Sequence, residues 1–160
     1  MSIRKLAALA AGAAAFAAGL AQAQVPQYGP NVTLEQARKL IASGAAEARK
    51  NSWPVAITIV DTAGMLVAFE KMDGTQSGSV MISQDKAVSA AMLRRPTKVI
   101  QEAVAGGGAG VRFLGLRYAT PVEGGLPITV DGKIIGAIGV SGVTSEQDGM
   151  VAAAGLAGLK

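Results

Sequence analysis

Apolar and polar residues alternate with the period of an α-helix over residues 33–50. The apolar positions of this stretch are Leu34, Ala37, Leu40, Ile41, Ala45 and Ala48. Such a stripe is typical of a helix that packs on a core. The helix is predicted to begin after Thr33, because Thr33-Leu34-Glu35-Gln36 is a capping box that satisfies the first free amides. It is predicted to end near Lys50, before the helix-breaking Trp53-Pro54.

Two later stretches have the pattern of β-hairpins. In residues 55–70, VAITIV and MLVAFE flank Asp61-Thr62-Ala63-Gly64, which fits a type I turn. In residues 126–140, LPITV and KIIGAIGV are joined by Asp131-Gly132, a pair typical of tight two-residue turns. Because hairpins join antiparallel strands, the predicted fold class is α+β, with an antiparallel sheet flanked by helices.

The strand of residues 134–140 is apolar on both faces. Strict alternation places one set on each side of the sheet: Ile134, Gly136, Ile138 and Val140 against Ile135, Ala137 and Gly139. A strand that is apolar on both sides is a central strand covered on each face. Its glycines let another element approach closely, and Ser141-Gly142 is expected at the rim of a pocket.

Three more helices are predicted, over residues 79–94, 97–104 and 144–159. The last begins with a second capping box, Thr144-Ser145-Glu146-Gln147. AGGGAG at residues 105–110 is interpreted as a flexible connection, because it lacks the Lys-Ser/Thr ending of a phosphate loop.

The helices predicted over residues 79–94 and 144–159 have no clean polar face. This pattern predicts burial at a subunit interface, and hence a homo-oligomer.

The first 23 residues have the pattern of a secretory signal peptide. Arg4-Lys5 precede an apolar stretch, and Ala21-Gln22-Ala23 has small residues at the two positions that signal peptidase recognises. An uncleaved membrane anchor is the alternative, but it needs a longer apolar span. Cleavage before Gln24 predicts a periplasmic or secreted protein with a linker over residues 24–32 and one domain over residues 33–160.

Composition excludes several kinds of chemistry. Removal of the leader takes away two of the 15 basic residues, which leaves 13 against 11 acidic residues and a net charge of +2. We therefore expect no nucleic-acid partner. The chain has no histidine and no cysteine, so a Ser-His-Asp or Cys-His nucleophile and a zinc site with nitrogen and sulfur ligands are excluded. Acid–base chemistry would fall to Asp, Glu, Lys or Tyr.

Lys86 is the most suggestive charged residue. On a helical wheel it lies between Ile82 and Leu93, inside the apolar stripe. The pattern favours a side chain that snorkels from the edge of the stripe to water. The alternative is a buried ammonium with a partner or an anionic ligand. Asp148 lies in the first turn of the last predicted helix, where the helix dipole alone would explain an acidic residue.

Three other short motifs could contact a ligand. Arg94-Arg95-Pro96-Thr97 places two guanidinium groups beside a hydroxyl, which suits a carboxylate. The alternative is charge that complements a helix C-terminus, followed by a Thr97 N-cap. Gly124-Gly125 precedes a strand, where bare amides could face a ligand or form a strained turn. The amides that follow Ser141 could gather for an anion at the start of the last helix.

Long stretches of the chain resemble a known family. They are WPVAITIVDTAGMLVAFEKMDG, DKAVSAAMLRRPT, EGGLPITVDGKIIGAIGVSG and TSEQDGMVAAAGLAGL, within residues 31–159. In order and spacing they are similar to the GlcG/HbpS family of haem-binding or haem-degrading-type domains, which also forms the C-terminal domain of PduO proteins. The resemblance implies a profilin-like α/β/α sandwich, oligomers that are often octamers, and binding of haem or a corrinoid.

The resemblance also implies a set of pocket residues. On the family pattern these are Lys86, Pro96-Thr97, Gly124-Gly125, Gly139, Ser141-Gly142 and Asp148. Haem propionates could bind Arg95 or Lys86. In the absence of histidine, an iron ligand would have to come from Tyr118, Met72, Met81, Met92, a lysine or Thr97.

The expected function is that of a secreted, oligomeric binding protein for haem or a similar tetrapyrrole, in haem or iron sensing or sequestration. The alternative is an enzyme or accessory protein that acts on a small oxoacid or a diol-derived metabolite. In that case Lys86, paired with Asp148 or Glu123, would perform acid–base chemistry.

Overall fold

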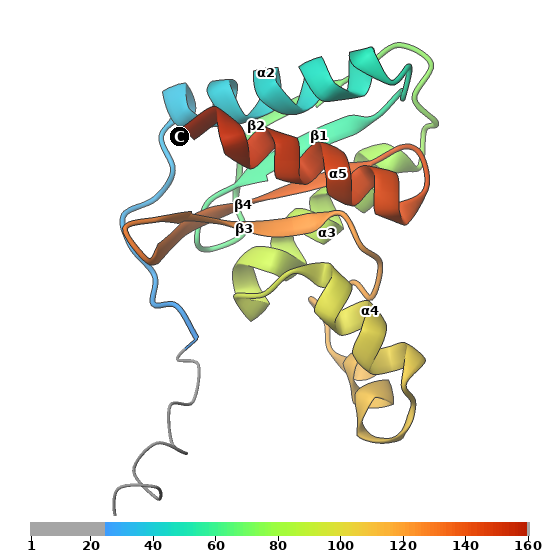
Figure 1. Cartoon of the computed structure of the whole chain (residues 1–160). Coiled ribbons are helices and arrows are strands. Elements are labelled where there is room, and N and C mark those ends of the chain that lie inside the picture. Colours follow the sequence, from blue (N-terminus) through green and yellow to red (C-terminus); the bar gives the residue numbers. More distant parts are fainter. Residues whose placement is uncertain (1–24, 160) are drawn as a thin grey trace, which may run out of the picture.

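A computed structural model describes residues 25–159, which form a three-layer α/β/α sandwich (Figure 1). The four strands of its antiparallel sheet have the order β2-β1-β4-β3. Helices α2 (Leu34–Lys50) and α5 (Ser145–Leu156) lie side by side on one face of the sheet, and α3 (Ser79–Leu93) lies on the other. The predicted α+β class is confirmed. The predicted signal peptide, residues 1–23, lies outside the described residues.

Both capping boxes are present. Gln36 N donates to Thr33 Oγ1 at 3.2 Å, and Thr33 N donates to Gln36 Oε1 at 2.9 Å. The Thr144 and Gln147 pair makes the same two bonds, at 3.3 and 3.2 Å. Local chemistry therefore sets where α2 and α5 begin. A 3₁₀ turn, η3 (Ala157–Leu159), follows α5 and completes the range predicted for the last helix.

The two predicted hairpins form the whole sheet. One joins β1 (Ala56–Val60) to β2 (Leu66–Lys71), and the other joins β3 (Gly125–Val130) to β4 (Lys133–Ser141). In the second hairpin, both residues of Asp131-Gly132 have positive φ, at 49° and 73°. A primed two-residue turn requires this conformation.

Strand β4 is central, between β1 and β3, as its two apolar faces predicted. The strict alternation predicted for it is wrong at its start, because Ile135 is an extra residue in the pairing with β3. Ile128 pairs with Gly136, and the next residue, Thr129, pairs with Ile134. This β-bulge turns the Ile135 side chain into the core on the α2–α5 face.

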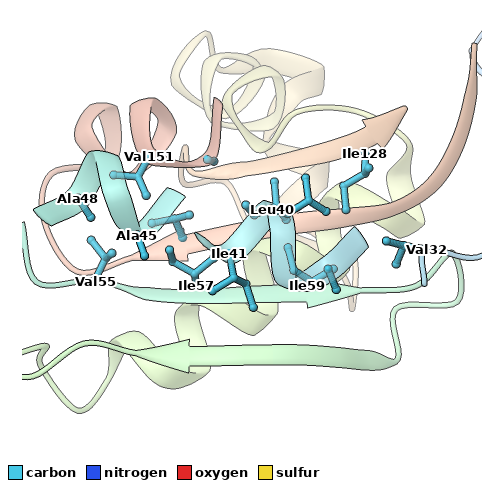
Figure 2. Close-up of a cluster of buried hydrophobic side chains, with 14 of the residues drawn as sticks. Val32, Leu40, Ile41, Ala45, Ala48, Val55, Ile57, Ile59, Ile128 and Val151 are labelled. Atoms are coloured by element: carbon cyan, nitrogen blue, oxygen red, sulfur yellow. The ribbon is translucent and has the colours of Figure 1, made fainter. Parts of the chain in front are cut away.

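The α2–α5 face of the sheet is packed with large aliphatic side chains (Figure 2). They come from α2, α5, the three strands β1, β3 and β4, and the residue before β1. The largest of them that are fully buried are Leu40, Ile57, Ile59, Ile128, Ile138, Val55, Val140 and Val151. This face is the hydrophobic core of the domain.

The α3 face is packed with small residues. Ala87, Ala90 and Ala91 contact Val60 and its neighbours on the sheet. A Cβ atom on Gly139 would collide with the backbone of α3, so this glycine permits the close approach that its pattern predicted.

Between α3 and β3, the chain extends away from the sandwich as helix α4 (Thr97–Ala105) and the 3₁₀ helix η2 (Gly108–Gly115) (Figure 1). The connection predicted over residues 105–110 is therefore partly regular, although Gly107 and Gly108 have positive φ. None of the helices within residues 25–159 has the length and apolar character needed to cross a membrane.

Candidate functional site

One face of α3 carries a row of polar side chains, Ser79, Ser83, Lys86 and Ser89, which we call the polar seam. Spacings of four, three and three residues put them on the same side of a helix. All four are buried against the rest of the domain. The Ser89 hydroxyl accepts a hydrogen bond from the Thr120 amide at 3.1 Å.

The two serines at the start of the seam pair with hydroxyls of the sheet. The Ser79 and Ser141 hydroxyl oxygens are 3.1 Å apart, and those of Ser83 and Thr58 are 2.8 Å apart. Hydroxyls buried without a partner would destabilise the fold, so these pairs fix how α3 lies on the sheet.

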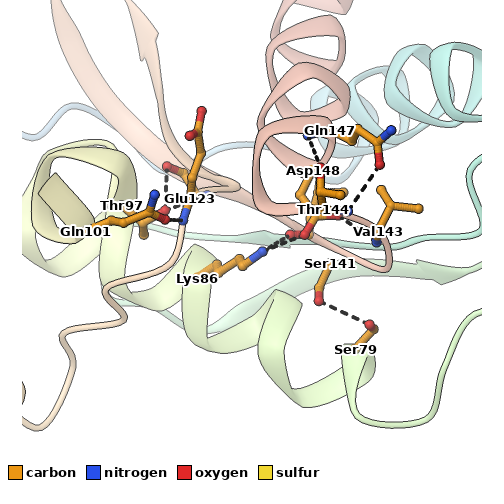
Figure 3. Close-up of polar contacts among 12 residues, drawn as sticks. Ser79, Lys86, Thr97, Gln101, Glu123, Ser141, Val143, Thr144, Gln147 and Asp148 are labelled. Carbon is orange, nitrogen blue, oxygen red and sulfur yellow. Dashed lines mark hydrogen bonds and ion pairs between the residues drawn. The ribbon is translucent and has the colours of Figure 1, made fainter. Parts of the chain in front are cut away.

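Lys86 lies in the middle of the seam and is 1% exposed. Its Nζ donates to Asp148 Oδ2 at 2.7 Å and to the Val140 carbonyl at 2.9 Å (Figure 3). The predicted snorkelling lysine is therefore wrong, because the sheet and α5 cover the side chain. The alternative, a buried ammonium with a partner, is correct, and the partner is the Asp148 carboxylate.

Asp148 is 2% exposed, and its second oxygen, Oδ1, accepts from the Val143 amide at 3.2 Å. Burial raises the pKa of Asp148 above its ordinary value, while the Lys86 ammonium and the Val143 amide act in the opposite direction. This carboxylate occupies the N-terminal end of α5. The chain itself thus provides an anion where free amides were expected to bind one.

The Gly124-Gly125 turn lies directly over this ion pair. A Cβ on Gly124 would be 2.8 Å from Lys86 Nζ and 3.0 Å from Asp148 Cβ, and its φ of +127° also favours glycine. The Gly125 amide donates to Thr97 Oγ1 at 2.9 Å. The predicted Thr97 N-cap is wrong, because Pro96 is the N-cap of α4 and the Thr97 hydroxyl bonds the start of β3 instead.

Six of the eight predicted site residues thus come together at one end of the sheet: Lys86, Thr97, Gly124, Gly125, Ser141 and Asp148. None of the five cavities described for residues 25–159 is lined by any of them. Glu123, the other proposed partner of Lys86, instead bonds Lys98 at 2.8 Å. This closed cluster joins α3, α4 and α5 to the β3–β4 hairpin.

An open cavity of about 380 Å³ lies nearby, along the edge strand β3, and we call it the edge groove. It contains the predicted Arg95. Its lining is Pro26, Arg94, Arg95, Pro96, Leu126, Pro127, Thr129, Ile134 and Leu156. A second cavity, of about 430 Å³, shares Pro127, Thr129 and Leu156 with it and continues toward η3. The two cavities thus lie next to each other along β3 and the end of α5.

Two arginines give the edge groove its charge. Arg94 Nη1 donates to the Pro26 carbonyl at 3.3 Å, and Arg95 Nε donates to the Leu93 carbonyl at 3.0 Å. Each of these bonds uses one of the five N–H groups of a guanidinium. Apolar walls with two guanidinium groups suit a flat, apolar molecule that carries carboxylates.

Tyr118, the eighth predicted residue, lies outside both places. It is 43% exposed in the segment after η2, and the Arg117 guanidinium lies 5.4 Å from the centre of its ring. Among residues 25–159, no group of three or more acidic residues could hold a metal ion.

Sequence reasoning missed the polar seam and most of the edge groove. The seam had a signal in the spacing of its three serines around Lys86. The groove had none, because its lining comes from the segment before α2, the α3–α4 junction, the β3–β4 hairpin and α5.

Comparison with known proteins gives one family. Residues 32–157 match the family described as haem degrading protein HbpS-like. Protein GlcG of Escherichia coli K12 is 45% identical over 107 residues, which cover 67% of this chain and 78% of GlcG. An uncharacterized 15.0 kDa protein from the dhaT-dhaS intergenic region of Citrobacter freundii is 37% identical over 123 residues, 76% of this chain and 87% of that protein.

Solved structures share the fold. Klebsiella pneumoniae protein ORFY superposes with a TM-score of 0.75 at 31% identity, covering 88% of this chain and 97% of its own. A double mutant of Streptomyces reticuli HbpS has a TM-score of 0.76 at 26% identity, with coverage of 88% and 94%. The PduOC–haem complex has a TM-score of 0.73 at 24% identity, with coverage of 80% and 94%, and this likeness concerns the fold alone.

Proposed function

The chain belongs to the HbpS-like family, and from this premise we propose that it binds haem or a similar anionic tetrapyrrole in the edge groove. The family description names haem, and one structural neighbour is a haem complex. The observation that carries the proposal is the lining of the groove, which combines Leu126, Pro127 and Leu156 with the paired guanidinium groups of Arg94 and Arg95. The apolar side chains would contact the ring, and the arginines would bind its carboxylates.

The lining of the edge groove suits the ring and the carboxylates of a tetrapyrrole, but it includes none of the usual ligands for haem iron. Haem iron is commonly held by histidine, cysteine, methionine or tyrosine, and none of these side chains lines the edge groove. Thr97, another predicted iron ligand, is buried and bonded to Gly125. Binding in the groove would therefore depend on the ring and its carboxylates, so metal-free protoporphyrin should bind about as tightly as hemin.

A hemin titration of residues 24–160, followed by absorbance, tests the proposal. Wild type should show a saturable Soret shift. Arg95→Ala and Arg94→Ala should each weaken binding by about ten- to one-hundredfold, because each removes a charge-assisted hydrogen bond worth about 1.5–3 kcal/mol. Arg117→Ala is the matched control: Arg94 and Arg117 each lie over a tyrosine ring, Tyr28 and Tyr118, but Arg117 is outside the groove. Unchanged binding by an Arg94→Ala/Arg95→Ala double variant would refute the site.

The proposal extends to an oligomeric protein of the periplasm or the exterior that senses or sequesters haem or iron, as an octamer on the family pattern. Exposed apolar side chains support an assembly. Met81, Ile82 and Met92 project from α3, and Met65 and Leu66 lie exposed at the β1–β2 hairpin. A monomeric mass by light scattering at micromolar concentration would contradict the oligomer.

Acid–base chemistry on a small oxoacid has one supporting observation, the distance of 2.7 Å between Lys86 Nζ and Asp148 Oδ2. Both side chains are buried, and the Gly124-Gly125 turn covers them. A catalytic pair must reach its substrate within hydrogen-bond distance. The geometry therefore favours the binding function.

A further inference from the structure

The residues that precede α2 form a strap along the start of β4. The Gly29 amide donates to the Ile134 carbonyl at 2.8 Å, and the Ile134 amide donates to the Gln27 carbonyl at 2.9 Å. Tyr28 pairs with Ile134 as a parallel β-bridge. We call residues 25–31 the N-terminal strap. The linker predicted over residues 24–32 includes this strap, which these bonds hold beside the edge groove that Pro26 helps to line.

Tyr28 connects the strap to the end of α3. Its hydroxyl donates to the Ala91 carbonyl at 2.9 Å and lies 3.4 Å from the Met92 carbonyl. Carbonyls in the last turn of a helix have no donor within the helix. Tyr28 therefore caps α3 from outside, immediately before the two arginines of the groove.

The same tyrosine also holds Arg94. The guanidinium carbon of Arg94 lies 5.4 Å from the centre of the Tyr28 ring, within the range of a cation–π contact. Arg94 Nη1 donates to the carbonyl of Pro26, two residues before Tyr28 in the strap. Arg94 has a φ of 52°, a conformation that residues other than glycine adopt only when their surroundings favour it. The strap thus contacts the Arg94 guanidinium at two points, the Tyr28 ring and the Pro26 carbonyl.

We propose that Tyr28 is a positioning residue for ligand binding, which holds the Arg94 guanidinium at the groove so that it can receive a carboxylate of the ligand. This inference rests on the proposed function of the edge groove. The N-terminal strap, which lies outside the α/β/α sandwich, thus sets the geometry with which Arg94 binds a carboxylate. A guanidinium that is held in place loses less conformational entropy on binding than a mobile one.

The test is a double-mutant cycle with hemin as the probe. Tyr28→Ala should weaken binding about five- to tenfold, because it removes both the ring and the hydroxyl. Tyr28→Phe keeps the ring and should weaken binding less than about threefold. In an Arg94→Ala background, Tyr28→Ala should change affinity less than about twofold, because the group that it positions is absent. Hemin dimethyl ester, which has no free carboxylates, should bind wild type and Tyr28→Ala equally.

The outcomes separate this inference from the proposed function. Binding by Tyr28→Ala at wild-type affinity, while Arg94→Ala binds weakly, would overturn the inference alone. An equal loss from Tyr28→Ala with and without Arg94 would also overturn it, because Tyr28 would then act on the fold in general. If wild type shows no saturable binding, the proposed function fails and the inference fails with it. Circular dichroism of each variant checks that the fold is retained. If Tyr28→Ala does not fold, the milder Tyr28→Phe keeps the inference testable.

Discussion

The two faces of the sheet are packed by different means. On the α2–α5 face, branched aliphatic side chains such as Leu40, Ile57 and Ile59 form an apolar core (Figure 2). On the α3 face, alanines and Gly139 bring the helix close to the sheet, and buried hydroxyls and one ion pair fill the contact (Figure 3). The first face depends on apolar area removed from water, and the second on close approach and on polar groups that all have partners.

This difference predicts opposite sensitivities. Removal of side-chain volume should cost most on the α2–α5 face, where it leaves a cavity. On the α3 face, most side chains are already small, so added volume or a lost polar partner should cost most.

The largest effect is expected from separating the buried ion pair. Lys86→Met should lower the free energy of unfolding by about 3–5 kcal/mol, because it leaves the Asp148 carboxylate buried without its cation. The double variant Lys86→Met/Asp148→Asn should recover most of this loss, since no charge then stays buried. Urea denaturation at pH 7 measures both values. A double variant no more stable than Lys86→Met would show that the pair itself is not the cause.

Truncation on the α2–α5 face comes next. Leu40→Ala should lower the free energy of unfolding by about 2–5 kcal/mol, because Leu40 is fully buried between α2 and the sheet. Leu34→Ala, on the same helix at an exposed position, is the control and should change it by no more than about 0.5 kcal/mol. Similar losses of unfolding free energy in the two variants, again by urea denaturation, would contradict the assignment of the α2–α5 face as the hydrophobic core.

A smaller loss is expected from one added methyl group on the α3 face. Gly139→Ala should lower the free energy of unfolding by about 1–3 kcal/mol, because the new Cβ meets the backbone of α3 at Ser83 and Ala87. Gly115→Ala, where a Cβ meets no atom within 4 Å, is the matched control. Equal melting temperatures for the two variants would mean that α3 can move away from the sheet without cost.

Sequence predicted best the features with local chemical causes. Thr33 and Thr144 begin helices because each capping box is complete within four residues. Asp131-Gly132 closes a hairpin because both positions accept positive φ. The α2–α5 face followed from helical and strand periodicity, since its apolar stripes are wide and continuous.

Features that depend on distant partners could not be predicted in the same way. The Ile135 bulge arises from pairing with β3, and strict alternation along β4 gave no sign of it. Lys86 was predicted to snorkel from the edge of its stripe, because the helical wheel gives no sign of Asp148, its partner 62 residues away. The edge groove needs the N-terminal strap and α5 in position before Arg94 and Arg95 face an apolar wall. Spacing shows which residues share a face, but not what covers it.

The smallest predicted effect is a pH dependence of the α3 face. Burial raises the pKa of Asp148 in the folded protein above its ordinary value of 3.8, so the folded chain holds this proton more tightly than the unfolded chain. The resulting stabilisation is complete below pH 3.8 and is lost as pH rises through the raised pKa.

The free energy of unfolding of wild type, relative to Asp148→Asn, should therefore fall as pH rises across that window, because the amide cannot titrate and the groups that do not contact residue 148 cancel in the difference. Urea denaturation of both proteins over a series of pH values measures this slope. A rise instead of a fall would mean that the Lys86 ammonium outweighs burial. Folding would then favour the ionised form of Asp148, and the contribution of this carboxylate to stability would be larger at neutral pH than in acid.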